Sequence, residues 1–82
     1  MQLTREEIFN KVAEVIANHF EVAADQVNES MSIKDDLNAD SISVMEFVLE
    51  LEEAFGTEIS DEDAEKIQTV GAAVDYINSN LN

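Results

Sequence analysis

The chain has 82 residues, the length of one small domain, so residues 1–82 are expected to form a single unit. Its 19 Asp and Glu residues against 4 Lys and Arg give a formal net charge of −15, which disfavours nucleic acids and anionic membrane surfaces and favours basic protein partners. The absence of Cys excludes disulfides and thiolate catalysis, and no signal peptide or membrane-length apolar run is visible, so a cytoplasmic protein is expected.

The first predicted helix covers residues 5–20. Thr4-Arg5-Glu6-Glu7 is a capping-box pattern, in which Thr4 caps the helix and Glu7 bonds back to it. The apolar residues that follow recur at near-helical spacing, and they are Ile8, Val12, Val15, Ile16 and Phe20. Residues 21–39 lack a sustained period and predict a long loop, pinned to the core by Val22, Val27, Met31 and Ile33.

Three more helices are predicted after this loop. Residues 41–55 are rich in apolar side chains without an interrupting Gly or Pro, Asp40 is a favoured N-cap, and Gly56 is a favoured C-cap. Ser60-Asp61-Glu62-Asp63 is a second capping-box pattern that predicts a short helix reaching about Ile67. Thr69 caps a last helix over residues 70–80, whose apolar face comprises Val70, Ala73, Val74 and Ile77. With no period-two alternation, the predicted fold is all-α: a four-helix bundle with three longer helices, a short third helix and a long first loop.

Ser41 lies where the long loop gives way to the second predicted helix. A hydroxyl there is exposed, and the positive end of the helix dipole tolerates a phosphate group. The alternative is that Ser41 only helps to begin the helix, since serine is favoured at that position. Nucleophilic catalysis is not expected, because His19 is the only histidine and no nucleophile-elbow pattern surrounds the serine. His19 is interpreted as a partner of the helix dipole or a packing residue.

Residues 35–65 hold twelve Asp and Glu and no Lys or Arg, so these acids are candidate metal ligands. Asp36 could begin an EF-hand loop, but Ser41 stands where that loop needs Gly, and Phe47 stands where it needs a bidentate Glu. No high-affinity metal site is therefore expected, while weak divalent binding by the clustered acids remains open.

The predicted helix over residues 41–55 has two apolar faces. One face suits the core and comprises Phe47, Leu51 and Phe55. The other lies nearer Ser41 and comprises Ile42, Met45 and Leu49, bordered by Glu46, Glu52 and Glu53. Exposed apolar side chains rimmed by charge are typical of a protein interface, although a helix buried on most sides would show the same pattern.

The run Asp36-Leu37-Asn38-Ala39-Asp40-Ser41-Ile42 resembles the modification motif of acyl carrier proteins. Glu46, the run from Glu50 to Phe55 and the run from Glu58 to Ile67 resemble the second and third helices of that family, and the likeness covers nearly the whole chain. The resemblance implies a four-helix bundle with a long first loop. It also implies 4′-phosphopantetheine on Ser41, beside Asp40, which a phosphopantetheinyl transferase adds from coenzyme A and whose thiol holds acyl chains as thioesters.

Three positions depart from the usual pattern of the family. Ile42 replaces a leucine, Ser43 replaces a frequent acid, and Ser60 stands where a proline is common. None of these changes removes a chemical group that the implied modification requires. A second, specialised carrier is compatible with them.

The resemblance implies a carrier for fatty-acid synthesis and not an enzyme. Its expected partners are the transferase and the fatty-acid synthesis and acyltransferase enzymes with basic patches, which would contact Ile42, Met45, Glu46, Leu49, Glu52, Glu53 and Asp61. An acyl chain is expected in a pocket of Phe47, Val48, Leu51, Ile59, Ala64 and Ile67. The chain is expected to be a monomer. The alternatives are a carrier of D-alanyl, polyketide or aminoacyl cargo and an acidic adaptor or weak divalent-binding module.

Overall fold

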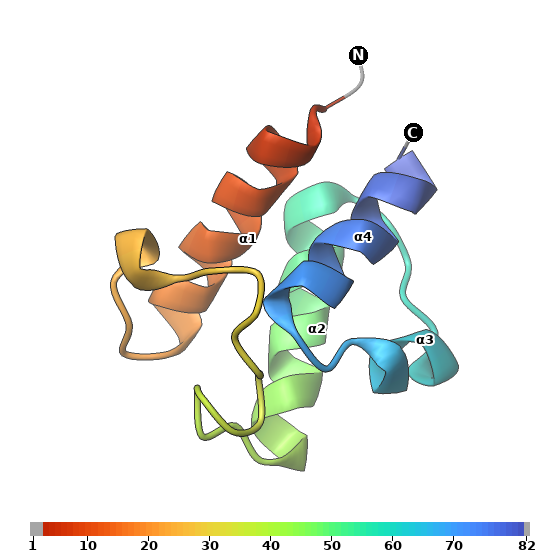
Figure 1. Cartoon of the computed structure of the whole chain (residues 1–82). Helices are drawn as coiled ribbons and strands as arrows, with labels where there is room; N and C mark the ends of the chain where they lie inside the picture. Colours follow the sequence, from red (N-terminus) through yellow and green to blue (C-terminus); the bar gives the residue numbers. More distant parts are fainter. Residues whose placement is uncertain (1–2, 82) are drawn as a thin grey trace.

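The computed structural model describes residues 3–81 and contains four α-helices (Figure 1). They are α1 (Arg5–His19), α2 (Ser41–Phe55), α3 (Asp61–Lys66) and α4 (Val70–Leu81), and a short 3₁₀ helix, η1 (Ala24–Gln26), lies within the first loop. The predicted all-α bundle with a short third helix is confirmed, and the helix ends agree with the predicted ones to within one residue. Among the described residues, the only β-type pairing is an isolated bridge between Ser32 and Thr69.

The helices begin at the capping residues that the sequence predicts. Thr4 Oγ1 accepts from the Glu7 amide at 3.1 Å, and the Glu7 carboxylate accepts from the Thr4 amide at 3.0 Å, which lowers the pKa of Glu7. Thr69 Oγ1 accepts from the Ala72 amide at 3.0 Å. Gly56 ends α2 with a φ of +63°, a backbone conformation that few other residues adopt readily.

The predicted capping box at the start of α3 is only half formed. Ser60 Oγ accepts from the Asp63 amide at 3.2 Å, as expected. The Asp63 carboxylate does not return a bond to Ser60, because it accepts instead from the Tyr76 hydroxyl of α4 at 2.9 Å. A tertiary contact has therefore replaced the local one, and it joins α3 to α4.

The core lies between α1, α2 and α4, with part of the first loop over it (Figure 1). Its largest fully buried side chains are Ile8, Val12, Ile16, Ile33, Phe47, Leu51, Val70, Val74 and Ile77. The first loop is pinned as predicted, since Val27 and Ile33 are buried and Val22 and Met31 pack against the core. No residue of α3 is fully buried. The short helix therefore rests on the bundle without contributing to its centre.

Backbone hydrogen bonds fasten the first loop to the start of α4. The Ile33 amide donates to the Gln68 carbonyl at 3.0 Å, the Val70 amide to the Met31 carbonyl at 3.1 Å, and the Gly71 amide to the Glu29 carbonyl at 2.9 Å. We call residues 29–33 and 68–71 the loop–α4 junction. Because these bonds connect distant parts of the chain, they fix where the loop leaves the bundle and returns to α2.

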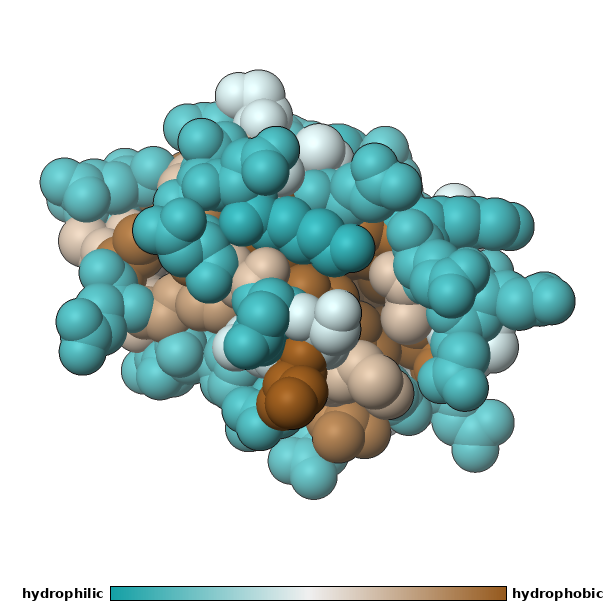
Figure 2. All heavy atoms as spheres, turned by 90° about the horizontal axis from the view of Figure 1, so that it is seen from below, coloured by the Kyte–Doolittle hydropathy of each residue, from teal (hydrophilic) through white to brown (hydrophobic). Residues whose placement is uncertain are grey.

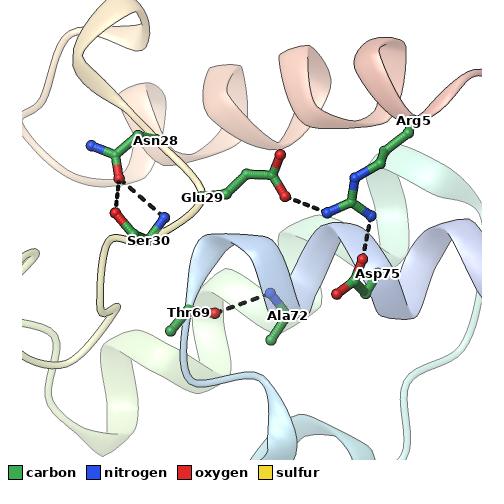
Figure 3. Close-up of polar contacts among 7 residues, drawn as sticks. All are labelled: Arg5, Asn28, Glu29, Ser30, Thr69, Ala72 and Asp75. Carbon is green, nitrogen blue, oxygen red and sulfur yellow. Dashed lines mark hydrogen bonds and ion pairs between the residues drawn. The ribbon is translucent and has the colours of Figure 1, made fainter.

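An arginine reinforces the loop–α4 junction from α1. The Arg5 guanidinium donates to the carboxylates of Asp75 on α4 and Glu29 in the loop (Figure 3). The hydrogen bond with Asp75, followed by that with Glu29, raises the pKa of Arg5. Three segments that are far apart in the sequence are thus held by one side chain.

Candidate functional site

Ser41 is the first residue of α2, and its side chain is exposed. Within residues 3–81, its hydroxyl has no hydrogen-bond partner, whereas the preceding Asp40 caps the helix by accepting from the Ser43 amide at 2.8 Å. This bond lowers the pKa of the Asp40 carboxyl. Two residues earlier, Asn38 adopts a φ of +54°, which turns the loop toward the helix. The helix is capped by Asp40, so the Ser41 hydroxyl is free for chemistry.

A cavity of about 510 Å³ opens beside Ser41, between α2 and α3. Ser41 is itself part of the lining, together with Lys34, Val44, Met45, Val48, Asp61, Ala64, Glu65, Ile67 and Gln68. The outer wall is α3, whose Asp63 is held by Tyr76 of α4, and this hydrogen bond raises the pKa of Tyr76. The cavity is therefore bounded on one side by a core helix and on the other by the least buried helix.

The structure divides the predicted acyl-pocket residues into two groups. Val48, Ala64 and Ile67 line the cavity. Phe47, Leu51 and Ile59 do not line it, and their side chains are buried within the core. Sequence reasoning missed Val44, which helical spacing could have found, since it lies three residues after Ser41 and four before Val48. It also missed Lys34 and Gln68, which come from non-helical segments with no periodic signal.

The second apolar face of α2 is exposed, so it is not buried in the bundle. Ile42 is 69% exposed, Met45 57% and Leu49 56%, and among residues 3–81 these are the large hydrophobic residues most open to solvent. They follow one another at helical spacing and form what we call the apolar stripe. Seen from the end of the molecule where α2 begins, hydrophobic residues emerge amid a largely hydrophilic surface (Figure 2).

Acids border the apolar stripe. Glu46, Glu53 and Asp61 are exposed, and Glu52 is half-buried. The Glu46 carboxylate lies 3.6 Å from Nε2 of His19, which reaches over from the end of α1. The His19 ring packs edge-on against Phe20, with centroids 4.9 Å apart. His19 is thus a partly buried packing residue at a helix C-terminus, as interpreted from the sequence.

The described part of the chain shows neither a metal-binding cluster nor an apolar helix of membrane-spanning length. Residues 3–81 contain no group of three or more His, Cys, Asp or Glu arranged to hold a metal ion. None of the helices within this range is long and apolar enough to cross a membrane. The free hydroxyl of Ser41, the cavity beside it and the apolar stripe are therefore the features that need a functional explanation.

Comparisons with known proteins agree with this geometry. Residues 10–77 match the family described as "Phosphopantetheine attachment site". The chain is 50% identical to an acyl carrier protein of Lactobacillus johnsonii over 98% of its length and 100% of the relative's. It is 53% identical to an acyl carrier protein of Lactobacillus acidophilus, over 94% and 96% of the two lengths.

A solved acyl carrier protein from Enterococcus faecalis has the same fold. It shares 76% sequence identity with this chain, with a TM-score of 0.80, and the match covers 95% of this chain and 99% of that one. The resemblance inferred from the motif around Ser41 is confirmed, and so is the phosphopantetheine cofactor that it implied. The chain belongs to the acyl carrier protein family.

Proposed function

We propose that this protein carries growing acyl chains on a 4′-phosphopantetheine arm attached to the Ser41 hydroxyl and delivers them to fatty-acid synthesis enzymes. The observation that carries the proposal is the exposed Ser41 hydroxyl at the start of α2, which has no hydrogen-bond partner among residues 3–81, in a chain that matches a phosphopantetheine attachment family. A phosphodiester at this position benefits from the positive end of the helix dipole. Asp40 already caps the helix, so modification of Ser41 removes no structural bond.

The residues present indicate which chemical groups the protein supplies and which the phosphopantetheine arm must supply. The chain contains no Cys, so a thioester needs the thiol that phosphopantetheine supplies when bound. Near Ser41 the protein offers a hydroxyl, a cavity and a charged surface, and its only histidine contacts Glu46. We therefore assign it no catalytic step of its own. Partner enzymes perform the chemistry on the cargo.

The cavity between α2 and α3 is proposed to shelter the acyl chain. Its volume of about 510 Å³ lies within the range of ligand pockets, and its apolar lining residues are Val44, Val48, Ala64 and Ile67. Ser41 is part of the same lining, so a chain tethered there begins at the cavity. The buried Phe47, Leu51 and Ile59 lie outside this lining and would border the chain only if the core opened further.

The apolar stripe and the acids around it are proposed to receive partner enzymes. Ile42, Met45 and Leu49 offer apolar contact beside the modified serine. Glu46, Glu52, Glu53 and Asp61 would attract basic patches on a phosphopantetheinyl transferase and on fatty-acid synthesis and acyltransferase enzymes. We propose that a monomer makes these contacts, one partner at a time.

Attachment is tested by intact mass after incubation with coenzyme A and a phosphopantetheinyl transferase. The wild type should gain one phosphopantetheine group, and Ser41→Ala should gain none. Ser43→Ala is the matched control, because it removes a hydroxyl from the same turn of α2 and should be loaded like the wild type. A phosphopantetheinylated peptide recovered from Ser41→Ala would place the arm elsewhere and refute the assignment.

The partner surface is tested by charge reversal. Glu46→Lys should slow loading by the transferase at low salt, and the difference from wild type should shrink as salt screens the charges. Glu14→Lys, an exposed acid on α1, makes the same change in net charge away from α2. If both variants slow loading equally, overall charge and not the surface near Ser41 governs the encounter.

A further inference from the structure

Most cationic side chains in the described residues lie close to a carboxylate or an aromatic ring. Arg5 bonds Asp75 and Glu29, and Lys66 Nζ lies 4.0 Å from Asp63. Lys11 Nζ lies 5.6 Å from the centroid of the Phe55 ring. Lys34 is the exception in residues 3–81, since no carboxylate comes within 4.0 Å of its ammonium and no aromatic ring lies under it.

The neighbours of Lys34 in the chain do not neutralise it. The Asp36 carboxylate accepts from the Ser32 amide at 2.7 Å, and the Asp36 amide donates to the Ser32 carbonyl at 2.8 Å. The Asp35 amide donates to Ser32 Oγ at 3.2 Å. These bonds hold the turn that carries Lys34, while its own side chain stays exposed. The backbone position is thus fixed and the ammonium is free.

Lys34 lines the same cavity as Ser41. The other charged groups in that lining are Asp61 and Glu65 of α3, both negative. An anionic group at Ser41 would therefore face two carboxylates on the α3 side and one ammonium on the loop side. Lysine binds phosphates as a compact point charge, so the loop side is where a phosphodiester would find attraction.

We propose that Lys34 is the counter-ion of the phosphodiester that joins phosphopantetheine to Ser41. The ammonium holds the proximal end of the arm over the cavity and offsets the repulsion from Asp61 and Glu65. This inference rests on the proposed attachment at Ser41 and adds a residue from the first loop to the site. It also gives the loop–α4 junction a role, since Ile33, beside Lys34, is bonded to Gln68.

The test compares wild type, Lys34→Gln and Lys11→Gln, each in the apo form and after loading with coenzyme A and a transferase. Lys11→Gln makes the same charge change at a residue that does not line the cavity. The readouts are the melting temperature of both forms and the ³¹P chemical shift of the phosphodiester. In Lys34→Gln, the holo-minus-apo difference in melting temperature should fall by about 1–6 °C at low salt and less at high salt. The ³¹P shift should move in Lys34→Gln and stay at the wild-type value in Lys11→Gln.

Each other outcome has a defined meaning. Equal behaviour of the two variants in both readouts would overturn the role of Lys34. A loss of stability in Lys34→Gln that is the same for the apo and holo forms would also overturn the role of Lys34. It would mean that the ammonium stabilises the protein through its attraction to Asp61 and Glu65 and not to the phosphodiester. If the wild type gains no phosphopantetheine mass, the attachment at Ser41 itself fails, and the inference about Lys34 fails with it. Loading of all three proteins separates these cases.

Discussion

The loop–α4 junction and the α2–α3 side of the molecule are built in opposite ways. At the junction, backbone hydrogen bonds join the first loop to α4, and Arg5 forms ion pairs with Glu29 and Asp75 (Figure 3). On the α2–α3 side, α3 buries no residue, a cavity separates it from α2, and the Ser41 hydroxyl has no partner in the described chain. One region is closed and held by ion pairs, and the other is open and acidic.

The contrast indicates where this protein needs rigidity and where it needs freedom. Segments with few buried contacts open locally at low free-energy cost, whereas densely bonded segments open only with the whole fold. The junction holds the loop that leads into Ser41, so its rigidity keeps the serine at the start of α2. Since α3 buries no residue, we expect it to move more easily than the junction, which would let the cavity change its size. Substitutions in the two regions should therefore have different consequences for the protein.

Ala64→Phe should block the cavity on the open side. In the wild type, stability should rise with the length of an acyl chain tethered to Ser41, by at most about 0.8 kcal/mol per methylene removed from water, and then level off when the cavity is full. In Ala64→Phe the added ring fills this space, so acylation should add little. The measurement is a melting series on apo, holo and acylated proteins. Ala23→Phe, at an exposed loop position outside the cavity, is the control. An equal rise in Ala64→Phe and wild type would show that the chain stays in solvent.

Gly71→Ala should damage the closed side. A Cβ on Gly71 would lie 3.0 Å from the Glu29 carbonyl oxygen, which is held in place because it accepts from the Gly71 amide itself. A glycine-to-alanine change inside a helix normally gains about 1 kcal/mol, but here the overpacking should cost about 1–3 kcal/mol. Urea unfolding monitored by circular dichroism measures the difference. A gain in stability would mean that the Glu29 backbone can shift to make room for the added Cβ at little cost.

Tyr76→Phe should loosen α3 without disturbing the junction. The hydroxyl bond to Asp63 contributes about 0.5–1.5 kcal/mol, so amide hydrogen exchange in α3 should become about 2- to 12-fold faster, with α4 little changed. The pKa of Tyr76 is raised, so this contribution is present below the ordinary pKa of tyrosine, 10.0, and is lost as pH rises through the higher folded-state value. Unchanged amide hydrogen exchange in α3 would mean that packing, and not the hydrogen bond from Tyr76, holds this helix in place.

Asp40→Asn should make stability less sensitive to acid, with the smallest effect of the four. The pKa of Asp40 is lowered by the Ser43 amide, so its stabilising contribution is present above the ordinary carboxyl pKa of 3.8 and is lost as pH falls through the lower folded-state value. Asparagine caps a helix comparably but does not titrate. Wild type should therefore exceed the variant in melting temperature at pH 7 and lose that advantage below about pH 4. A difference in melting temperature that stays constant with pH would contradict a stabilising role for the Asp40 charge.

Much of the fold could be predicted because its signals are local. The caps at Thr4, Asp40, Gly56 and Thr69 are properties of one to four residues, and the apolar spacing of each long helix fixes its buried face. The exposure of Ile42, Met45 and Leu49 was an open choice between interface and core, because a helical wheel gives a side chain's direction but not what lies opposite it. The three-dimensional arrangement decided it in favour of exposure.

What the sequence could not provide are contacts between distant segments. The sequence predicts that Asp63 completes a capping box, but the Asp63 carboxylate accepts a hydrogen bond from Tyr76 of α4 instead. Gly71 carried no turn signal, since its role is to allow the Glu29 backbone to approach. Lys34 and Gln68 reach the cavity from loops that have no period. In each case the partner is fixed by the packing of helices that lie elsewhere in the chain.

The bonds of the loop–α4 junction also bear on the order in which the chain can fold. They connect positions roughly 40 residues apart, so they can form only after a long loop has closed. We therefore expect them to form later and more slowly than the helices themselves. Because synthesis runs from the N-terminus, α1 and α2 are made before residues 68–71. We therefore expect Ser41 to be present in the nascent chain before the loop that leads to it can be anchored to α4.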